Sequence, residues 1–327
     1  MRVRDAAVVI TGAGSGIGRA SALAFADAGA LLVLAGRRGH TLAELARECE
    51  ARGGEALPVE VDVTDPAAVE QLAQRAVQRF GRIDVWVNNA AVTMFAPFAQ
   101  MPLADLRRVI EVNVVGCVHG ARSALRQVRA QGSGVLINVS SVVGRIAQPY
   151  TSAYSMSKAA VRSLSVSLRQ ELLLDGVRGV KVCTVLPATA DTPIYRQTAN
   201  YTGRAAEPMP PVYSPQRVAR TIVNLVRLPR REVVSGPLGR LLLLAHGLAP
   251  GLTERIFARQ VDRRHLSRTR PAAATSGTLY EPAADPRTDE VAGGWGGRRR
   301  TIVRTATAAT VGVAGAAVLR RAMQGAR

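Results

Sequence analysis

The chain has few of the residues that build disulfide frameworks and metal sites. Only three cysteines and four histidines occur among its 327 residues. Cys49, Cys117 and Cys183 are odd in number, lie far apart and fall in apolar segments, so we expect buried free thiols. No spacing of cysteines or histidines is typical of a bound metal. The absence of a disulfide framework is typical of the reducing cytoplasm, which is the location we expect.

An apolar leader is also absent from the start of the chain. Residues 1–5 lead straight into a strand-like run, with no apolar stretch before a small-residue cleavage site, so we expect no signal peptide. The hydrophobic fraction of 47% is typical of a globular protein. A chain of 327 residues can form one large domain or two small ones.

Acidic residues are scarce compared with basic ones, most of all in the last part of the chain. The formal net charge is +19, and residues 191–327 carry 22 basic and 9 acidic side chains against 21 and 15 in residues 1–190. This excess indicates an acidic partner, such as anionic lipid or nucleic acid, or else a solvated arginine-rich face. An aromatic–basic stripe, a zinc spacing and a helix-turn-helix pattern are all missing, so we expect no nucleic-acid partner.

Apolar runs typical of buried strands alternate with segments of helical periodicity. The strands are expected at residues 6–10, 31–35, 57–61, 83–88, 135–140 and 180–186. The helices are expected at residues 16–29, 41–53, 66–80, 103–131 and 152–174. The alternation predicts an α/β fold of the Rossmann type, a doubly wound parallel sheet with helices on both faces, followed by a C-terminal helical and irregular extension. Ligands of such sheets bind beyond the carboxyl ends of the strands.

A tyrosine and a lysine four residues apart fall in the last of these predicted helices. Tyr154 and Lys158 therefore lie on one helix face. Tyrosine is a poor acid or base at neutral pH because its unperturbed pKa is about 10, but a nearby cation lowers that pKa. With Ser141 upstream, the pair can serve a hydride-transfer enzyme. The alternative is a helix with one buried tyrosine and one solvated lysine.

A glycine-rich turn joins the first predicted strand to the first predicted helix. Residues 11–18 read Thr-Gly-Ala-Gly-Ser-Gly-Ile-Gly, with Gly12, Gly16 and Gly18 set four and two residues apart. Glycines here allow a tight turn and a close backbone approach to a pyrophosphate, which the N-terminus of the helix then binds. The alternative is an ordinary strand-to-helix turn.

These motifs together resemble the short-chain dehydrogenase/reductase family over roughly residues 5–236. Residues 11–18 are similar to the family's Thr-Gly-x-x-x-Gly-x-Gly, and Asn88-Asn-Ala-Ala91 to its Asn-Asn-Ala-Gly. Further matches are Asp62 with Val63 after the third strand, Asn113 in Asn-Val-Val-Gly, Ser141, and the Tyr154–Lys158 pair. Ala91 and Ala188 stand where the family has glycine, which matters if those positions need a positive φ.

The resemblance implies a role for each of these residues. Tyr154 would give or take the proton on the substrate oxygen, and Ser141 would hydrogen-bond that oxygen. Lys158 would hold the nicotinamide ribose and lower the pKa of Tyr154, Asn113 would anchor a water in a proton relay, and Thr192 would contact the carboxamide or the phosphates. The cofactor contacts implied are Gly12, Ser15, Gly16, Ile17, Gly18, Arg37, Arg38, Asp62, Val63, Asn88, Tyr154, Lys158 and Thr192.

The end of the second predicted strand bears on the choice of cofactor. An NAD enzyme usually has an acidic residue there for the ribose hydroxyls. This chain has Gly36, Arg37 and Arg38 instead, and a guanidinium fits a phosphate bidentately. We therefore expect NADP rather than NAD, with Arg37 as the main contact. Two solvated arginines in a surface turn are the alternative.

The last ninety or so residues extend beyond the resemblance. We expect a catalytic domain at residues 1–237, a leucine-rich helical segment at 238–265 that is a lid, a membrane contact or ordinary core, and a linker-like segment at 266–300. Residues 301–327 are expected to form an apolar tail helix with basic flanks, which touches a membrane, spans it, or is free or docked.

The leading interpretation is an NADP-dependent oxidoreductase that interconverts an alcohol and a ketone or aldehyde. Its alternatives are a non-catalytic NADP-binding redox sensor and a membrane-associated scaffold. Apolar residues near Ser141 predict a lipophilic substrate: Met94, Phe95, Phe98, Val142, Val143 and Ile146. By analogy with the family, we expect a homodimer or homotetramer.

Overall fold

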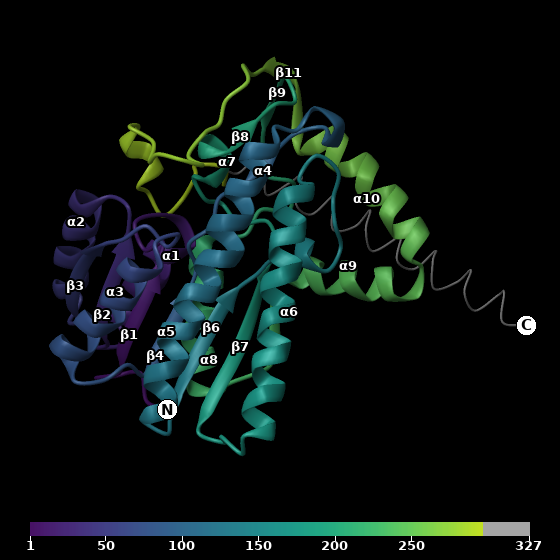
Figure 1. Ribbon diagram of the computed structural model, residues 1–327. Coiled ribbons are helices and arrows are strands. Elements are labelled where there is room, and N and C mark those ends of the chain that lie inside the picture. Colours follow the sequence, from purple (N-terminus) through teal and green to yellow (C-terminus); the bar gives the residue numbers. More distant parts are fainter. Residues whose placement is uncertain (297–327) are drawn as a thin grey trace, which may run out of the picture.

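The computed structural model describes residues 1–296, which are built around one parallel sheet (Figure 1). Its seven strands follow the order β10-β7-β6-β4-β1-β2-β3. They are β1 Ala7–Thr11, β2 Leu31–Gly36, β3 Glu55–Glu60, β4 Val85–Asn88, β6 Gly134–Val139, β7 Val180–Pro187 and β10 Glu232–Ser235. The order reverses between β1 and β4, and ligands of doubly wound sheets bind at such a reversal.

Helices cover both faces of the sheet. On one face lie α1 Gly16–Ala26, α2 Gly39–Glu50 and α8 Pro215–Arg227, whose apolar side chains pack with β1, β2 and β4. On the other face lie α3 Pro66–Phe80, α4 Leu103–Ile110, α5 Gly116–Ala130 and α6 Ser152–Leu174. The predicted doubly wound α/β fold is confirmed. All three cysteines are buried and free, as their apolar surroundings predict.

Local sequence explains where these helices begin and end, and α3 is the clearest case. Asp65 accepts hydrogen bonds from the backbone N–H groups of Ala67 and Ala68, and Pro66 occupies the first turn. A capping carboxylate followed by proline is typical of a helix start. Gly81 ends the helix with a φ of 76°, a conformation that glycine adopts at little cost.

The long helix predicted over residues 103–131 is divided in the structure. Between α4 and α5 the backbone forms a π-helical turn at Glu111–Val115. Apolar periodicity continues through such a turn, so the sequence pattern does not reveal it. Single π-turns occur often at functional sites, and this one contains Asn113.

The rest of the described chain forms an extension beside the carboxyl ends of the strands. Its helices α9 Pro237–Leu248 and α10 Pro250–Arg264 project from the body as a hairpin (Figure 1). The short elements are β5 Met94–Phe95, α7 Ile194–Gln197, β8 Ala199–Asn200, β9 Arg204–Ala206 and β11 Leu266–Pro271, with 3-10 turns at Phe98–Gln100, Val142–Gly144 and Pro286–Thr288. Strand β11 pairs antiparallel with β9, and β5 pairs parallel with β8.

The segment predicted as a linker differs from that expectation in its described part. Residues 266–271 form β11, and residues 278–296 are hydrogen-bonded to the catalytic domain. Its proline- and glycine-rich composition gives no periodic signal, because the contacts use backbone carbonyls and single polar side chains. The predicted tail helix at 301–327 lies outside the described residues. Within residues 1–296, no helix is both long and apolar enough to cross a bilayer.

Candidate active site

A cavity of about 330 Å³ lies beyond the carboxyl ends of β1, β2, β4, β6 and β7. The glycine-rich loop and the ends of β2 and β3 line one end of it. Ser141, Tyr154 and Lys158 line the middle, and side chains from α9, α10 and the segment before α8 line the other end. The sequence therefore brings most of its predicted site residues into one space.

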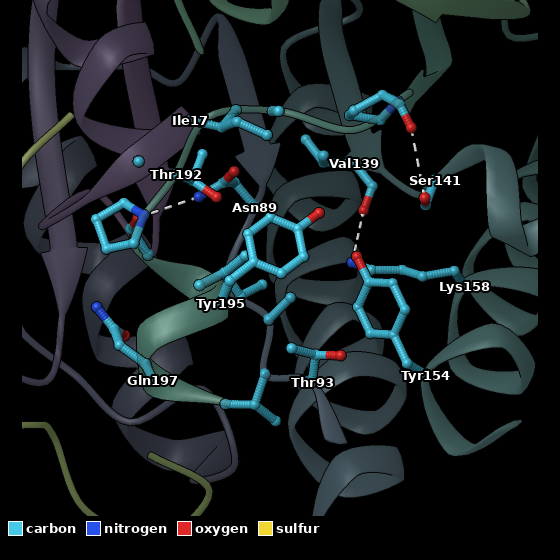
Figure 2. Close-up of a pocket in the computed structure, with 18 of the residues that line it drawn as sticks. Ile17, Asn89, Thr93, Val139, Ser141, Tyr154, Lys158, Thr192, Tyr195 and Gln197 are labelled. Carbon is cyan, nitrogen blue, oxygen red and sulfur yellow. Dashed lines mark hydrogen bonds between the residues drawn. The ribbon is translucent and has the colours of Figure 1, made fainter. Parts of the chain in front are cut away.

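Tyr154 and Lys158 stand one turn apart on α6 and lie side by side in the cavity (Figure 2). The Lys158 ammonium is 5.5 Å from the centre of the Tyr154 ring. It also donates to the backbone oxygen of Val139, the last residue of β6, at 3.0 Å. Since Lys158 is only 3% exposed, this bond fixes a buried cation beside the phenol.

The pKa values of this pair differ from the expectation that Lys158 lowers the pKa of Tyr154. Burial raises the pKa of Tyr154 to about 12, although the Ser141 hydroxyl acts in the opposite direction. Burial also lowers the pKa of Lys158 to about 8. Desolvation disfavours the charged form of each group, which raises the pKa of the tyrosine and lowers that of the lysine. Tyr154 therefore keeps its proton at neutral pH and can donate it.

Ser141 and Ser140 follow β6 but face different neighbours. The Ser140 hydroxyl donates to the backbone oxygen of Lys158 at 2.6 Å and so ties β6 to α6. The Ser141 hydroxyl donates to the Pro187 oxygen at 3.4 Å and lies at the cavity beside Tyr154. Both serines line the cavity, and the Ser141 hydroxyl is the one beside Tyr154, in line with its spacing along the chain.

Asn113 does not line the cavity but is connected to the helix that carries Tyr154. Its side-chain amide nitrogen donates to the backbone oxygen of Val92 and to the Ser157 hydroxyl, both at 2.9 Å. Its amide oxygen accepts from the Val92 N–H at 2.8 Å. The Ser157 hydroxyl in turn donates to the backbone oxygen of Tyr154. The structure thus gives Asn113 a positioning contact with α6.

The glycine-rich loop packs too closely for side chains at two of its positions. Gly12 has a φ of +65°, and a Cβ there would lie 2.7 Å from the Ala90 Cα. A Cβ on Gly18 would lie 2.0 Å from the Gly12 oxygen, so Gly18 lets α1 approach the loop rather than touching a ligand. Ser15, Gly16 and Ile17 line the cavity at the start of α1, where a helix N-terminus favours anions.

The remaining predicted cofactor contacts divide into those at the cavity and one outside it. Asp62, Val63 and Thr192 line the cavity. Burial raises the pKa of the Asp62 carboxyl, but hydrogen bonds from Thr64 and the nearby Arg108 outweigh it, so the pKa is lowered. Asn88, which the sequence predicted as a cofactor contact, does not line the cavity. Its side chain is buried among bonds with Trp86, Cys117 and Asn138, because strand alternation turns it into the layer of helices, while Asn89 and Ala90 line the cavity.

Arg37 and Arg38 both reach this end of the cavity, and both are already bonded. Arg37 donates to the backbone oxygens of Tyr280 and Thr278, each at 2.9 Å. Arg38 forms an ion pair with Asp289 at 2.6 Å. Of the two, Arg38 lies nearer the glycine-rich loop, 4.0 Å from where a Gly14 Cβ would stand. Both arginines thus lie at the dinucleotide end of the cavity with protein partners of their own, and Arg38 is the nearer to the glycine-rich loop.

The two departures from the family pattern cause no backbone strain. Among the described residues, only Asp5 and Tyr150 combine a side chain with a positive φ. Ala91 and Ala188 therefore have ordinary backbone conformations, and both line the cavity. A glycine is not required at either position.

The substrate end of the cavity is formed only partly by the residues predicted from the sequence. Phe95, Val142 and Val143 line it, whereas Ile146 and Met94 are buried behind its wall and Phe98 is 73% exposed. Proximity along the chain to Ser141 cannot show which side chains turn inward. The side chains that the prediction missed come from distant segments: Tyr195, Met209, Leu242, Phe257 and His265.

His265 is the one strongly polar group among these missed residues. Its ring is buried, lies 4.9 Å from the Phe95 ring centre and 5.5 Å from that of Tyr195, and its Nδ1 is bonded to the Glu207 oxygen. Burial lowers the pKa of His265 to about 4, although the bond to Glu207 acts in the opposite direction. The ring is therefore neutral at pH 7, with Nδ1 as the donor.

We predict that His265 makes the fold less stable in acid. Because the pKa falls from about 6.5 in the unfolded chain to about 4 in the fold, its contribution is complete above pH 6.5 and is lost as pH falls toward 4. The maximum slope is about 1.4 kcal/mol per pH unit. Urea unfolding at pH 7 and pH 5 should show a smaller loss for His265→Gln than for the wild type. Equal losses would contradict the prediction.

Within residues 1–296, no cluster of three or more histidine, cysteine or acidic side chains could hold a metal ion. The site residues instead fit a dinucleotide. A glycine-rich loop opens onto the cavity at a helix N-terminus, Asp62 lies just after β3, and the Tyr154–Lys158 pair lines the cavity near the end of β6.

Comparison with known proteins agrees with this geometry. The model of the short chain dehydrogenase family matches residues 6–201. The uncharacterized oxidoreductase YxnA of Bacillus subtilis (strain 168) is 33% identical over 258 residues, which are 78% of this chain and 72% of that protein. Cis-4-hydroxycyclohexanecarboxylate dehydrogenase of Sinomonas cyclohexanicum is 37% identical over 221 residues, 66% of this chain and 87% of that protein.

Solved structures show the same relationship. A short-chain dehydrogenase/reductase from Burkholderia phymatum in complex with NAD has a TM-score of 0.70 at 26% identity and covers 78% of this chain and 97% of its own. An alcohol dehydrogenase from the archaeon Thermococcus sibiricus complexed with 5-hydroxy-NADP has a TM-score of 0.61 at 27% identity and covers 69% and 94%. With the family model matching more than half of its length, the chain belongs to the short-chain dehydrogenase/reductase family, whose members are NAD- or NADP-dependent oxidoreductases of alcohol and carbonyl groups.

Proposed function

We propose that this chain is an NADP-dependent oxidoreductase that interconverts a lipophilic alcohol and its ketone or aldehyde. The observation that carries the proposal is the meeting of Tyr154, Lys158 and Ser141 in one cavity with the glycine-rich loop. A redox sensor or scaffold would not need a buried lysine held beside a protonated tyrosine.

Each residue of the trio has a role that its surroundings support. Tyr154 keeps its proton at neutral pH, so it can protonate the oxygen of a carbonyl as that oxygen gains charge. Ser141 can donate a hydrogen bond to the same oxygen and stabilise that charge. Lys158, fixed by Val139, would hold the nicotinamide ribose and favour the phenolate that remains. The bound nicotinamide supplies or accepts the hydride.

The preference for NADP rests on the end of β2. Arg37 and Arg38 follow Gly36, no carboxylate belongs to the strand end itself, and guanidinium groups fit phosphate. Gly12, Ser15, Gly16, Ile17, Asp62, Val63 and Thr192 would form the rest of the dinucleotide site, with Gly18 supporting the loop. One related structure holds NAD and another an NADP derivative. Family membership therefore does not determine the cofactor, and the proposed preference for NADP depends on Arg37 and Arg38.

A lipophilic substrate is supported by the side chains at the far end of the cavity. Phe95, Met209, Leu242 and Phe257 offer apolar contact, and Leu242 and Phe257 belong to the α9–α10 hairpin. We therefore propose that residues 238–265 form a lid on a catalytic domain of residues 1–237. The Sinomonas relative is named for cis-4-hydroxycyclohexanecarboxylate, a substrate with an apolar ring that also carries a hydroxyl and a carboxylate.

Rates of NADPH and NADH oxidation test this proposal. The substrates should range from small polar sugars to cyclic and long-chain ketones at fixed ionic strength. We expect higher kcat/KM with NADPH and with the apolar ketones. Preferential turnover of small polar sugars would contradict the substrate class, and a preference for NADH would contradict the cofactor.

The assembly, location and tail remain proposals as well. We propose that the protein is cytoplasmic, because its three buried cysteines are free thiols. We also propose a homodimer or homotetramer, because relatives of this family often assemble through their long helices. Light scattering of the purified protein would show the mass. A vesicle-flotation assay of the full chain would test membrane contact by the C-terminal segment.

A further inference from the structure

The segment of residues 278–290, here called the strap, crosses the end of the cavity where the adenosine part of a dinucleotide would lie. In Figure 1 it forms part of the yellow end of the chain, and it touches the turn after β2 and the start of α1. Arg37 donates to the backbone oxygens of Thr278 and Tyr280. The Gly16 N–H donates to the Glu290 oxygen at 3.0 Å. The strap therefore uses groups that the dinucleotide site itself offers.

One strap residue, Asp289, adds a negative charge to this place. One carboxylate oxygen pairs with Arg38 at 2.6 Å, and the other accepts a hydrogen bond from the Thr41 hydroxyl at 2.7 Å. Arg38 and Asp289 are both largely buried, with side-chain exposures of 16% and 20%. Arg38 also donates to the Thr288 hydroxyl at 2.9 Å. A charged group held by a guanidinium and a hydroxyl is the arrangement that a phosphate would need here.

The contacts on either side hold Asp289 in place. The Thr288 oxygen accepts from the Gln197 side chain at 2.9 Å, and the Glu290 oxygen accepts from Gly16. Asp289 is thus fixed by backbone bonds to α7 and to the start of α1. The position of the Asp289 backbone therefore does not depend on the ion pair alone, because the backbone bonds of its two neighbours hold the carboxylate beside Arg38.

We propose that Asp289 is a determinant of cofactor choice, an internal carboxylate that competes with the 2′-phosphate of NADP for Arg38. The inference rests on the proposed function, since it requires a dinucleotide in this cavity. A phosphate monoester carries a charge of about −1.5 to −2 at pH 7, so it displaces a carboxylate of charge −1 from a guanidinium. Asp289 therefore weakens binding of NADP without abolishing it, and leaves NAD, which lacks that phosphate, almost unaffected.

Direct binding of NADPH and NADH to the full chain tests this role. Removing the charge with Asp289→Asn is expected to tighten NADPH binding about tenfold, or about 1.4 kcal/mol, while the Kd for NADH changes less than about twofold. Adenosine 2′,5′-bisphosphate should show the same gain, and AMP should show none. In an Arg38→Ala background, Asp289→Asn should give no gain, because the competition requires the guanidinium.

The neighbouring Glu290→Gln is the matched control. It removes one negative charge from the same strap, but Glu290 contacts Gly16 through its backbone oxygen, and its side chain is exposed. Its Kd values should equal those of the wild type. Unchanged or weaker NADPH binding by Asp289→Asn, or equal tightening of NADPH and NADH, would overturn the inference while the proposed function stands. Failure of the wild type to bind either dinucleotide would overturn both.

Discussion

Replacing Tyr154 by phenylalanine is expected to lower kcat/KM for carbonyl reduction by about 10²- to 10⁴-fold, the usual contribution of a positioned proton donor. The ring remains, and with it the packing against Lys158 at 5.5 Å. Only the hydroxyl that would protonate the substrate oxygen is lost. The Kd for NADPH should therefore change little, and the loss should appear mainly in kcat. Steady-state rates and direct binding on the same preparation check both parts.

Tyr150→Phe is a matched control for this prediction. Tyr150 lies just before α6, and its hydroxyl is bonded to Asp262 at 3.3 Å rather than directed at the cavity centre. Its loss should leave kcat/KM within a few-fold of the wild type. If both variants lost activity equally, the effect would come from disturbing α6, and Tyr154 would not be the proton donor.

Gly18→Ala is expected to destabilise the fold by about 2–3 kcal/mol, the upper part of the range for overpacking. The added Cβ would stand 2.0 Å from the Gly12 oxygen and 2.7 Å from the Asn89 side-chain nitrogen. The nearest obstacle is backbone, which cannot move aside as a flexible side chain can. Either α1 or the loop must shift, so dinucleotide binding should weaken as well. Thermal unfolding without cofactor measures the first effect, and NADPH titration the second.

Gly14→Ala separates this clash from the general effect of adding a methyl group to the loop. A Cβ on Gly14 would be 3.5 Å from the nearest heavy atom, the Thr41 methyl carbon, which is an ordinary contact. Its melting temperature should stay close to that of the wild type. A loss as large as that of Gly18→Ala would show that loop flexibility, not close packing of α1, decides stability here.

The main elements of the fold could be predicted from the sequence because periodicity and turn chemistry agree. Helices α3 and α6 coincide with the predicted 66–80 and 152–174. The π-turn at Glu111–Val115 could not be predicted, because it preserves the apolar pattern while changing the hydrogen bonds. The strand and the domain contacts formed after residue 265 could not be predicted either, because the composition of that segment resembles that of a linker.

The site residues divide in the same way. Those set by short-range spacing, such as Ser141, Tyr154 and Lys158, meet in the cavity as the motifs predict. The side of a strand on which a residue lies is less easily read from a motif, which explains why Asn89 rather than Asn88 lines the cavity. His265 and Asp289 could not be found at all. They approach from far along the chain, and only the folded structure shows their neighbours.

Transfer of deuterium from NADPH labelled at the transferable nicotinamide position is the most direct test of the account. After incubation with a lipophilic ketone, mass spectrometry should find the label on the carbinol carbon of the alcohol. The product should form with the wild type and be nearly absent with Tyr154→Phe. Tight NADPH binding with no label transferred to any ketone or aldehyde of a broad panel would contradict the conclusion that this cavity carries out hydride transfer.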